Sequence, residues 1–299
     1  LWLTLIELQK YCLGGIIIME KVAILGSGNA ACAFSAYLGK KGHEVHLCDD
    51  EQFIDNLKYM MQHNGLNMTG AEQGFGKISM ITTDFEEAID DVEIIMVVVP
   101  AFGHKPMAQK LAPYLKDGQI VTLNPGAVFG AVEFLNTLRE FGNTADVTIA
   151  ETSSNMFATR RIGQDTVRIN AVKKKLPIAA IPSNRVDLVV DKLKDFFDSY
   201  VTAPSTILTS LLYTNPVLHT PGILLNTGWI ERTGGNFNFY YDGISPSVAK
   251  VGLGIDKERC AVSLAMGYPS MTLMEQLIDW YGPTDTTEIY AYYHHSKVH

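Results

Sequence analysis

The chain has 299 residues, of which 47% are hydrophobic and 19% charged, a composition typical of soluble globular proteins. Its formal net charge of −8 gives no support to a nucleic-acid or anionic-membrane partner. The 4 cysteines are scattered without a C-x-x-C pair, which argues against a zinc site or a disulfide framework and indicates a reducing, cytoplasmic environment.

Residues 1–18 are apolar, but they lack the basic n-region and small-residue cleavage site of a signal peptide. Glu7, Gln9 and Lys10 interrupt the run, which is too short for a membrane-spanning helix. Met19 resembles a natural start. We therefore expect residues 1–18 to be a non-native or disordered extension and expect no membrane partner; a membrane anchor is the alternative.

Residues 21–25 are apolar and rich in β-branched side chains, which predicts a buried strand. A G-x-G-x-x-A turn follows, then a helix from Ala30 to Lys40 and a second strand over residues 44–48. In this order the first glycine permits a tight turn, the second admits a pyrophosphate, and the alanine lets helix and strand pack. The predicted cofactor contacts at this turn are Gly26, Gly28, Asn29, Ala30 and Ala31.

Asp49 lies at the tip of the second predicted strand, about 20 residues after the turn, the spacing expected for a ribose-binding acid. A carboxylate here can accept hydrogen bonds from the ribose 2′-OH and repels a 2′-phosphate. We therefore expect NAD as the cofactor in preference to NADP.

Further strands are predicted over residues 76–83, 92–100, 119–123 and 147–150, separated by helical patterns. Strands alternating with helices indicate an α/β fold of the Rossmann type, a doubly wound parallel sheet with its ligand at the carboxyl edge. The loop after the 92–100 strand belongs to that edge. We expect cofactor contacts at Pro100 and Ala101 and a substrate contact at His104 in this loop.

Beyond residue 150 the pattern changes. Strands are predicted over 166–171 and 178–181, an amphipathic helix over 185–198, and a linker-like stretch near residue 204. Long helical patterns then dominate, above all residues 247–267, with Ser245 as cap. The predicted division is an NAD-binding Rossmann domain, 19–200, and an all-helical substrate domain, 201–299.

Two stretches of the second half, residues 215–226 and 239–248, resemble the helical domain of the octopine/nopaline-type opine dehydrogenases. The glycine turn, the segment 98–102 and the segment 124–126 resemble the first domain of that family. The resemblance implies reductive condensation of an amino acid with a 2-oxo acid such as pyruvate, with NADH as hydride donor. His219, set between two prolines that we expect to form rigid turns, matches the family's catalytic histidine, and an imidazole suits such proton transfers.

Other residues are weaker candidates. Asn215 is a candidate substrate contact or a plain turn residue before Pro216. Arg160 and its neighbour Arg161 are candidates to clamp a substrate carboxylate. Tyr240 and Tyr241 are interpreted as packing residues, His294 and His295 as part of a frayed tail, and no metal site is expected.

The resemblance also implies an aspartate that orients the catalytic histidine, in a segment beyond the long helices. We expect this chain to stop before that segment and to be weakly active or inactive as given. Asp279, Asp285 and Glu288 are the available carboxylates, and none lies in the matching motif. The molecule is expected to be a monomer or homodimer.

Two alternatives stay open. One is keto reduction of the ketopantoate-reductase or hydroxy-acid-dehydrogenase type, with Lys250 as the catalytic lysine. The other is a non-catalytic NAD-binding protein.

Overall fold

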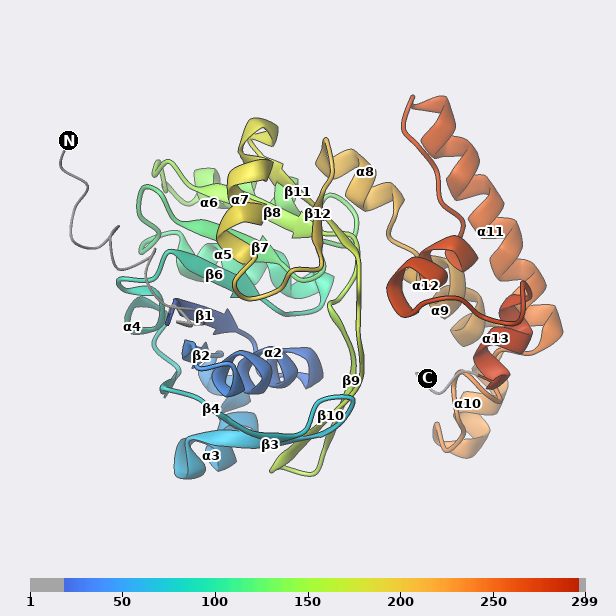
Figure 1. Ribbon diagram of the computed structural model, residues 1–299, viewed down its shortest axis with the longest axis horizontal. Helices are drawn as coiled ribbons and strands as arrows, with labels where there is room; N and C mark the ends of the chain where they lie inside the picture. Colours follow the sequence, from blue (N-terminus) through green and yellow to red (C-terminus); the bar gives the residue numbers. More distant parts are fainter. Residues whose placement is uncertain (1–18, 296–299) are drawn as a thin grey trace, which may run out of the picture.

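The computed structural model describes residues 19–295, so the expectation for residues 1–18 lies outside the described part. Figure 1 shows a sheet-containing part and a separate group of helices beside it. Among the helices of residues 19–295, none has both the length and the apolarity to cross a bilayer.

A mixed sheet of 8 strands forms the centre of the first part, in the order β12-β11-β8-β7-β6-β1-β2-β5. Neighbouring strands are parallel except β8 and β11. From β1 the chain continues to β2 on one side and later to β6 on the other, so the strand order reverses at β1, where such folds bind ligands. The strands are β1 (Lys21–Leu25), β2 (Glu44–Cys48), β5 (Met80–Thr82), β6 (Ile94–Val97), β7 (Ile120–Leu123), β8 (Thr148–Thr152), β11 (Leu176–Ile181) and β12 (Tyr200–Thr202).

Both faces of this sheet are buried. In β1, Val22 and Ile24 pack into one apolar core, while Ala23 and Leu25 pack into the other, because successive side chains of a strand point to opposite faces. Helices α2 (Asn29–Lys40), α3 (Ile54–His63) and α7 (Val186–Leu193) contribute to the first core. Helices α4 (Phe85–Ile89), α5 (His104–Leu111) and α6 (Gly130–Glu140) contribute to the second. The predicted Rossmann-type fold is confirmed.

A second sheet of 4 strands, in the order β4-β3-β10-β9, lies beside α2. The prediction of one strand over residues 76–83 is wrong, because this stretch divides between the two sheets. A side chain at Gly76 would overlap the Ala36 carbonyl oxygen, at 2.0 Å, so the chain passes close over α2 here before it joins the large sheet. The strands of the small sheet are β3 (Gly65–Gly70), β4 (Gly74–Lys77), β9 (Phe157–Ile162) and β10 (Thr166–Val172).

Other boundaries differ modestly. The predicted strand 92–100 is observed as β6, Ile94–Val97, because the apolar run continues into a loop that is itself buried at Val98. The predicted helix 185–198 is the shorter α7. Single turns of 3₁₀ helix are η1 (Glu51–Phe53), η2 (Ala101–Gly103) and η3 (Ser183–Arg185).

The rest of the described chain is helical, as predicted. The long helix α11 begins at Pro246, and its cap Ser245 accepts a hydrogen bond from the Val248 amide. Its partners share an apolar core that includes Leu218 and Trp280. The helices are α8 (Thr206–Leu211), α9 (Asn215–Leu224), α10 (Thr227–Thr233), α11 (Pro246–Ala265), α12 (Leu273–Tyr281) and α13 (Ile289–His295).

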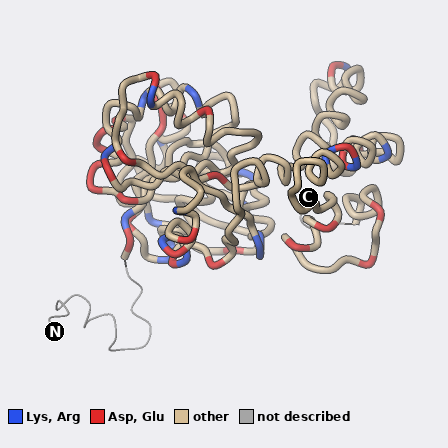
Figure 2. Tube along the Cα trace, turned by 90° about the horizontal axis from the view of Figure 1, so that it is seen from above, with Lys and Arg blue, Asp and Glu red and all other residues tan. Residues whose placement is uncertain are grey.

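Helix α8 connects the two parts. Its Leu208, with Leu212 just beyond its end, packs on Ala179 and Ala203 of the sheet-containing part. In the view of Figure 2, basic and acidic residues are interleaved around the sheet-containing part, and the two parts are joined by a narrow region.

Candidate functional site

A cleft of about 1300 Å³ lies between the sheet edge and the helical part. The sequence-predicted residues that line it come from both parts of the molecule. They are Gly28, Asn29, Ala30, Pro100, Ala101, Arg160, Asn215 and His219. The other predicted site residues, Gly26, Ala31, Asp49 and His104, do not line it.

The glycine turn has the shape that a pyrophosphate requires. Gly26 adopts φ +118°, and an added Cβ would lie 2.5 Å from the Val98 carbonyl oxygen. Gly28 is extended and forms the N-cap of α2, and nothing lies within 4 Å of an added Cβ there. A phosphate can therefore approach the backbone at Gly28 and the free N–H groups at the start of α2. The turn fits a dinucleotide.

Asp49 is buried beside this turn. Its carboxylate accepts a hydrogen bond from the Ser27 hydroxyl at 2.5 Å and one from the Asp50 amide at 2.8 Å. Burial raises the pKa of Asp49, and the hydrogen bond from Ser27 opposes that shift. Asp49 does not line the cleft, so its contact with the ribose stays a prediction.

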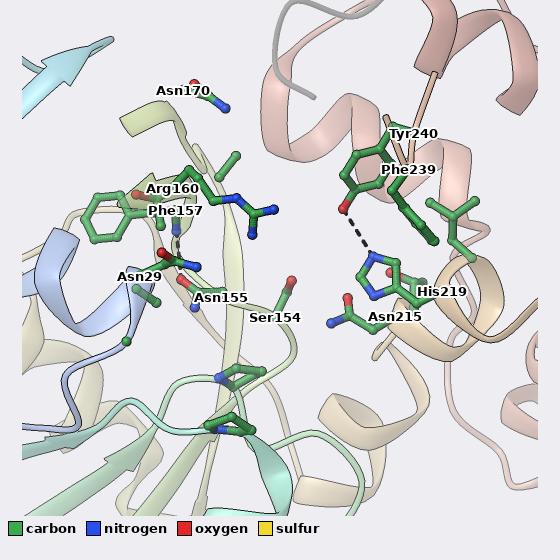
Figure 3. A pocket seen from close by; sticks show the side chains of 18 of the residues that line it. Asn29, Ser154, Asn155, Phe157, Arg160, Asn170, Asn215, His219, Phe239 and Tyr240 are labelled. Atoms are coloured by element: carbon green, nitrogen blue, oxygen red, sulfur yellow. Dashed lines mark hydrogen bonds between the residues drawn. The ribbon is translucent and has the colours of Figure 1, made fainter. Parts of the chain in front are cut away.

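His219 lies in the middle of α9. The expectation that prolines on both sides form turns is wrong: Pro216 occupies the first helical turn, where no N–H is needed, and Pro221 lies inside the helix. The His219 Nε2 lies 3.1 Å from the Tyr240 hydroxyl oxygen (Figure 3). The Phe239 ring packs edge-on against the imidazole, with 5.6 Å between the two ring centroids. Burial lowers the pKa of His219, so the neutral imidazole is favoured at neutral pH.

Tyr240 is a site residue that the sequence did not reveal. Tyr240 lies in a run of aromatic residues, a pattern typical of packing. No local pattern shows that its hydroxyl forms a hydrogen bond with His219, which lies 21 positions away in the sequence. Within residues 19–295, no carboxylate hydrogen-bonds to His219. Asp279 pairs with Lys175, and Asp285 and Glu288 are exposed.

The two neighbouring arginines have different roles. Arg160, in β9, extends toward the Tyr240 hydroxyl across the cleft in Figure 3. Burial raises the pKa of Tyr240, and the charge of Arg160 partly offsets this. Arg161 instead ties β9 to the nucleotide turn, because its amide donates to the Asn29 Oδ1 at 2.9 Å and its guanidinium to the Asn56 carbonyl.

His104, Lys250, His294 and His295 lie apart from the cleft. His104 begins α5 and is 1% exposed; burial lowers its pKa to about 4, although it hydrogen-bonds to the Pro125 backbone. Lys250 is exposed on α11. The frayed-tail prediction is wrong for His294 and His295, which form the last turn of α13. No group of three or more potential metal ligands occurs among the described residues.

Residues 202–299 match the model of the "NAD/NADP octopine/nopaline dehydrogenase, alpha-helical domain" family, and residues 22–168 match the ketopantoate reductase PanE/ApbA model. An opine dehydrogenase of Arthrobacter sp. (strain 1C) is 34% identical over 266 residues, 89% of this chain and 73% of the relative.

The fold is similar to that of an octopine dehydrogenase solved with NADH and L-arginine. The TM-score is 0.68 at 20% identity, covering 93% of this chain and 74% of that one. A yersinopine dehydrogenase solved with NADP⁺ gives a TM-score of 0.65 at 20% identity, and the match covers 89% of this chain and 68% of that one. The structural likeness establishes the fold, and the sequence match to the Arthrobacter enzyme establishes the family. The chain belongs to the opine dehydrogenase family of nicotinamide-dependent oxidoreductases.

Proposed function

We propose that this chain catalyses the reductive condensation of an amino acid with a 2-oxo acid such as pyruvate. An amino acid, a 2-oxo acid, NADH and one proton give a secondary-amine dicarboxylate, NAD⁺ and water. The observation that carries the proposal is that one cleft is lined both by the nucleotide turn at Gly28 and by His219 of the helical part.

His219 is the proposed proton carrier. In the reductive direction the protonated imidazole donates to the departing oxygen, and in the reverse direction the neutral ring accepts the proton. The Tyr240 hydroxyl, 3.1 Å from Nε2, orients the ring. Phe239 and Tyr240 pack beside the imidazole and limit the access of water to it.

The nucleotide turn is the proposed cofactor site, with Asn29 and Ala30 at the start of α2 and Pro100 and Ala101 at the end of β6. When bound there, NADH supplies the hydride. We propose that Asp49 makes NAD the preferred cofactor over NADP, since its charge at the end of β2 opposes a 2′-phosphate.

Asn215 and Arg160 are the proposed substrate contacts, because both line the cleft and Arg160 presents a guanidinium that can hold a carboxylate. We also propose a cytoplasmic location, a monomeric or homodimeric state, and a division into two domains near the predicted residue 200; we place it after Thr202, because β12 (Tyr200–Thr202) belongs to the large sheet. The scattered cysteines favour a reducing compartment.

The test is an NADH-oxidation screen of 2-oxo acids against a panel of amino acids. The proposal expects turnover only when both substrates are present. Turnover with the oxo acid alone would instead favour keto reduction, which the ketopantoate reductase match over residues 22–168 suggests.

The variant His219→Ala should lower kcat by about 10²- to 10⁴-fold, the range typical of a lost acid–base group, with little change in NADH affinity. Lys250→Ala is the matched control, because Lys250 is an exposed cation of the same helical part outside the cleft. Equal losses in both variants would refute the role of His219.

A further inference from the structure

Lys173 is a buried lysine at the wall of the cleft, in the turn between β10 and β11. It is 4% exposed, whereas the next two lysines, Lys174 and Lys175, are exposed. Its ammonium donates to the Asn155 carbonyl at 2.6 Å and to the Ser154 hydroxyl at 3.1 Å. The turn therefore directs one cation of three inward.

The aromatic side chains of α12 cover the ammonium on another side. The Lys173 Nζ lies 4.3 Å from the Trp280 ring centroid and 5.8 Å from that of Tyr281. The Lys174 amide donates to the Trp280 carbonyl, and Lys175 pairs with Asp279 at 3.1 Å. Lys173 is thus held in place from both parts of the molecule.

Within residues 19–295, no carboxylate lies within 4.0 Å of the Lys173 Nζ. A buried ammonium without a counter-ion is unfavourable, because neutral acceptors and aromatic faces replace only part of its hydration. Burial correspondingly lowers the pKa of Lys173 to about 7. An anion in the cleft would supply the missing charge.

We propose that Lys173, together with the Ser154 hydroxyl, binds a carboxylate of the substrate. The inference rests on the proposed function, because both an amino acid and a 2-oxo acid bring a carboxylate into this cleft. Ser154 accepts from Lys173 and can donate its own hydrogen to the same carboxylate. Its side chain points into the open part of the cleft, between Arg160 and His219, in Figure 3.

The first test is steady-state kinetics of Lys173→Met, which keeps an unbranched side chain one atom shorter and removes the charge. The Michaelis constant for one substrate should rise by about 10- to 100-fold, the loss typical of a charged hydrogen bond, while kcat changes much less. A rise for the oxo acid assigns the site to its carboxylate, and a rise for the amino acid assigns it to the amine donor.

Lys175→Met is the matched control, because Lys175 also contacts α12 but does not line the cleft. It should leave both Michaelis constants within about twofold. If Lys173→Met also leaves both unchanged, or if the two variants behave alike, Lys173 only holds the two parts together and the inference fails.

The second test is independent of turnover. Oxalate, a small dicarboxylate that cannot be reduced here, is titrated by calorimetry with and without NADH. Its affinity should fall by about tenfold or more in Lys173→Met and by a smaller factor in Ser154→Ala, with thermal melts confirming folded protein. Absence of oxalate binding to the unaltered chain, or equal binding to Lys173→Met, would overturn the inference. If no substrate pair is turned over but Lys173→Met weakens oxalate binding, Lys173 still forms a carboxylate-binding site and the proposed function fails.

Discussion

At the scale of single residues, the side chains of Asp49 and Ser27 form a hydrogen-bonded pair beside the nucleotide turn. The Ser27 hydroxyl donates to Asp49, and Asn56 donates to the Ser27 oxygen at 3.1 Å, so the carboxylate is held beside the turn. Two effects of Asp49, its charge and its hydrogen bond to the turn, can therefore be separated by mutation.

Asp49→Asn should lower the preference for NADH over NADPH by about tenfold or more, since it removes the charge that repels a 2′-phosphate and keeps the shape of the side chain. The measurement is the ratio of kcat/KM, or of binding constants, for the two cofactors. Ser27→Ala is the control, because it removes the hydrogen bond and keeps the carboxylate. If Ser27→Ala changes the preference for NADH over NADPH and Asp49→Asn does not, the geometry of the turn, not the charge of Asp49, selects the cofactor.

At the level of elements, the two glycines of the G-x-G-x-x-A turn lack a side chain for different physical reasons. Gly26 has a backbone conformation and a close approach to Val98 that exclude a side chain. Gly28 has an ordinary backbone conformation and open space, so only a bound ligand would meet a side chain there.

We expect Gly28→Ala to leave the melting temperature nearly unchanged and to weaken NADH binding by about tenfold or more, because the methyl group occupies the path of the pyrophosphate. Gly26→Ala should instead destabilise the fold by about 1–3 kcal/mol, the cost of a strained backbone. Thermal melts and NADH fluorescence titrations measure the two effects. Unchanged NADH affinity in Gly28→Ala would show that the phosphates lie elsewhere.

At the scale of the whole molecule, Glu151 joins the sheet to the first helix of the helical part. Its fully buried carboxylate accepts hydrogen bonds from the Ala131 amide at 2.8 Å and from the Thr209 hydroxyl of α8 at 2.6 Å. Burial raises its pKa, and these hydrogen bonds only partly offset the shift. The protonated form is therefore favoured in the folded protein more than in the unfolded chain.

A raised folded-state pKa means that the stability contributed by Glu151 is present at acidic pH and is lost as pH rises from the ordinary glutamate range through the folded pKa. Glu151→Gln removes this titration, and Thr209 can still donate to the Thr206 carbonyl while it accepts from the new amide. In urea unfolding between about pH 5 and pH 8, the stability of the unaltered chain should therefore fall relative to that of Glu151→Gln. If the difference in unfolding free energy between the unaltered chain and Glu151→Gln does not change with pH, the raised pKa of Glu151 is contradicted.

The Rossmann-type class of the fold, the nucleotide turn and the helical second part were predictable from the sequence, because their signals lie within a few residues of one another. The order of the strands, the antiparallel pairing of β8 with β11 and the second sheet of 4 strands were not predicted, because they depend on long-range pairing. Continuous runs of apolar, β-branched side chains, the spacing of glycines and the Ser245 cap are short-range signals. Strands β3, β9 and β12 were not predicted, and residues 76–83 do not form the single strand that was predicted. Gly76 permits a close pass of this stretch over α2, and that contact is invisible in a local pattern.

The site was only partly predictable. The family resemblance singled out His219 and the G-x-G-x-x-A turn singled out Gly28, because both lie in recognisable local motifs, and both residues line the cleft. The tertiary structure alone decided that Tyr240 bonds to His219, that His104 lies outside the cleft, and that Lys173 is buried while its neighbours are exposed. The physical reason is that burial and hydrogen bonding of these side chains depend on residues far apart in the sequence that tertiary packing brings together, within one part for Tyr240 and His104 and between the two parts for Lys173. Helices and turns instead follow mainly from interactions between near neighbours.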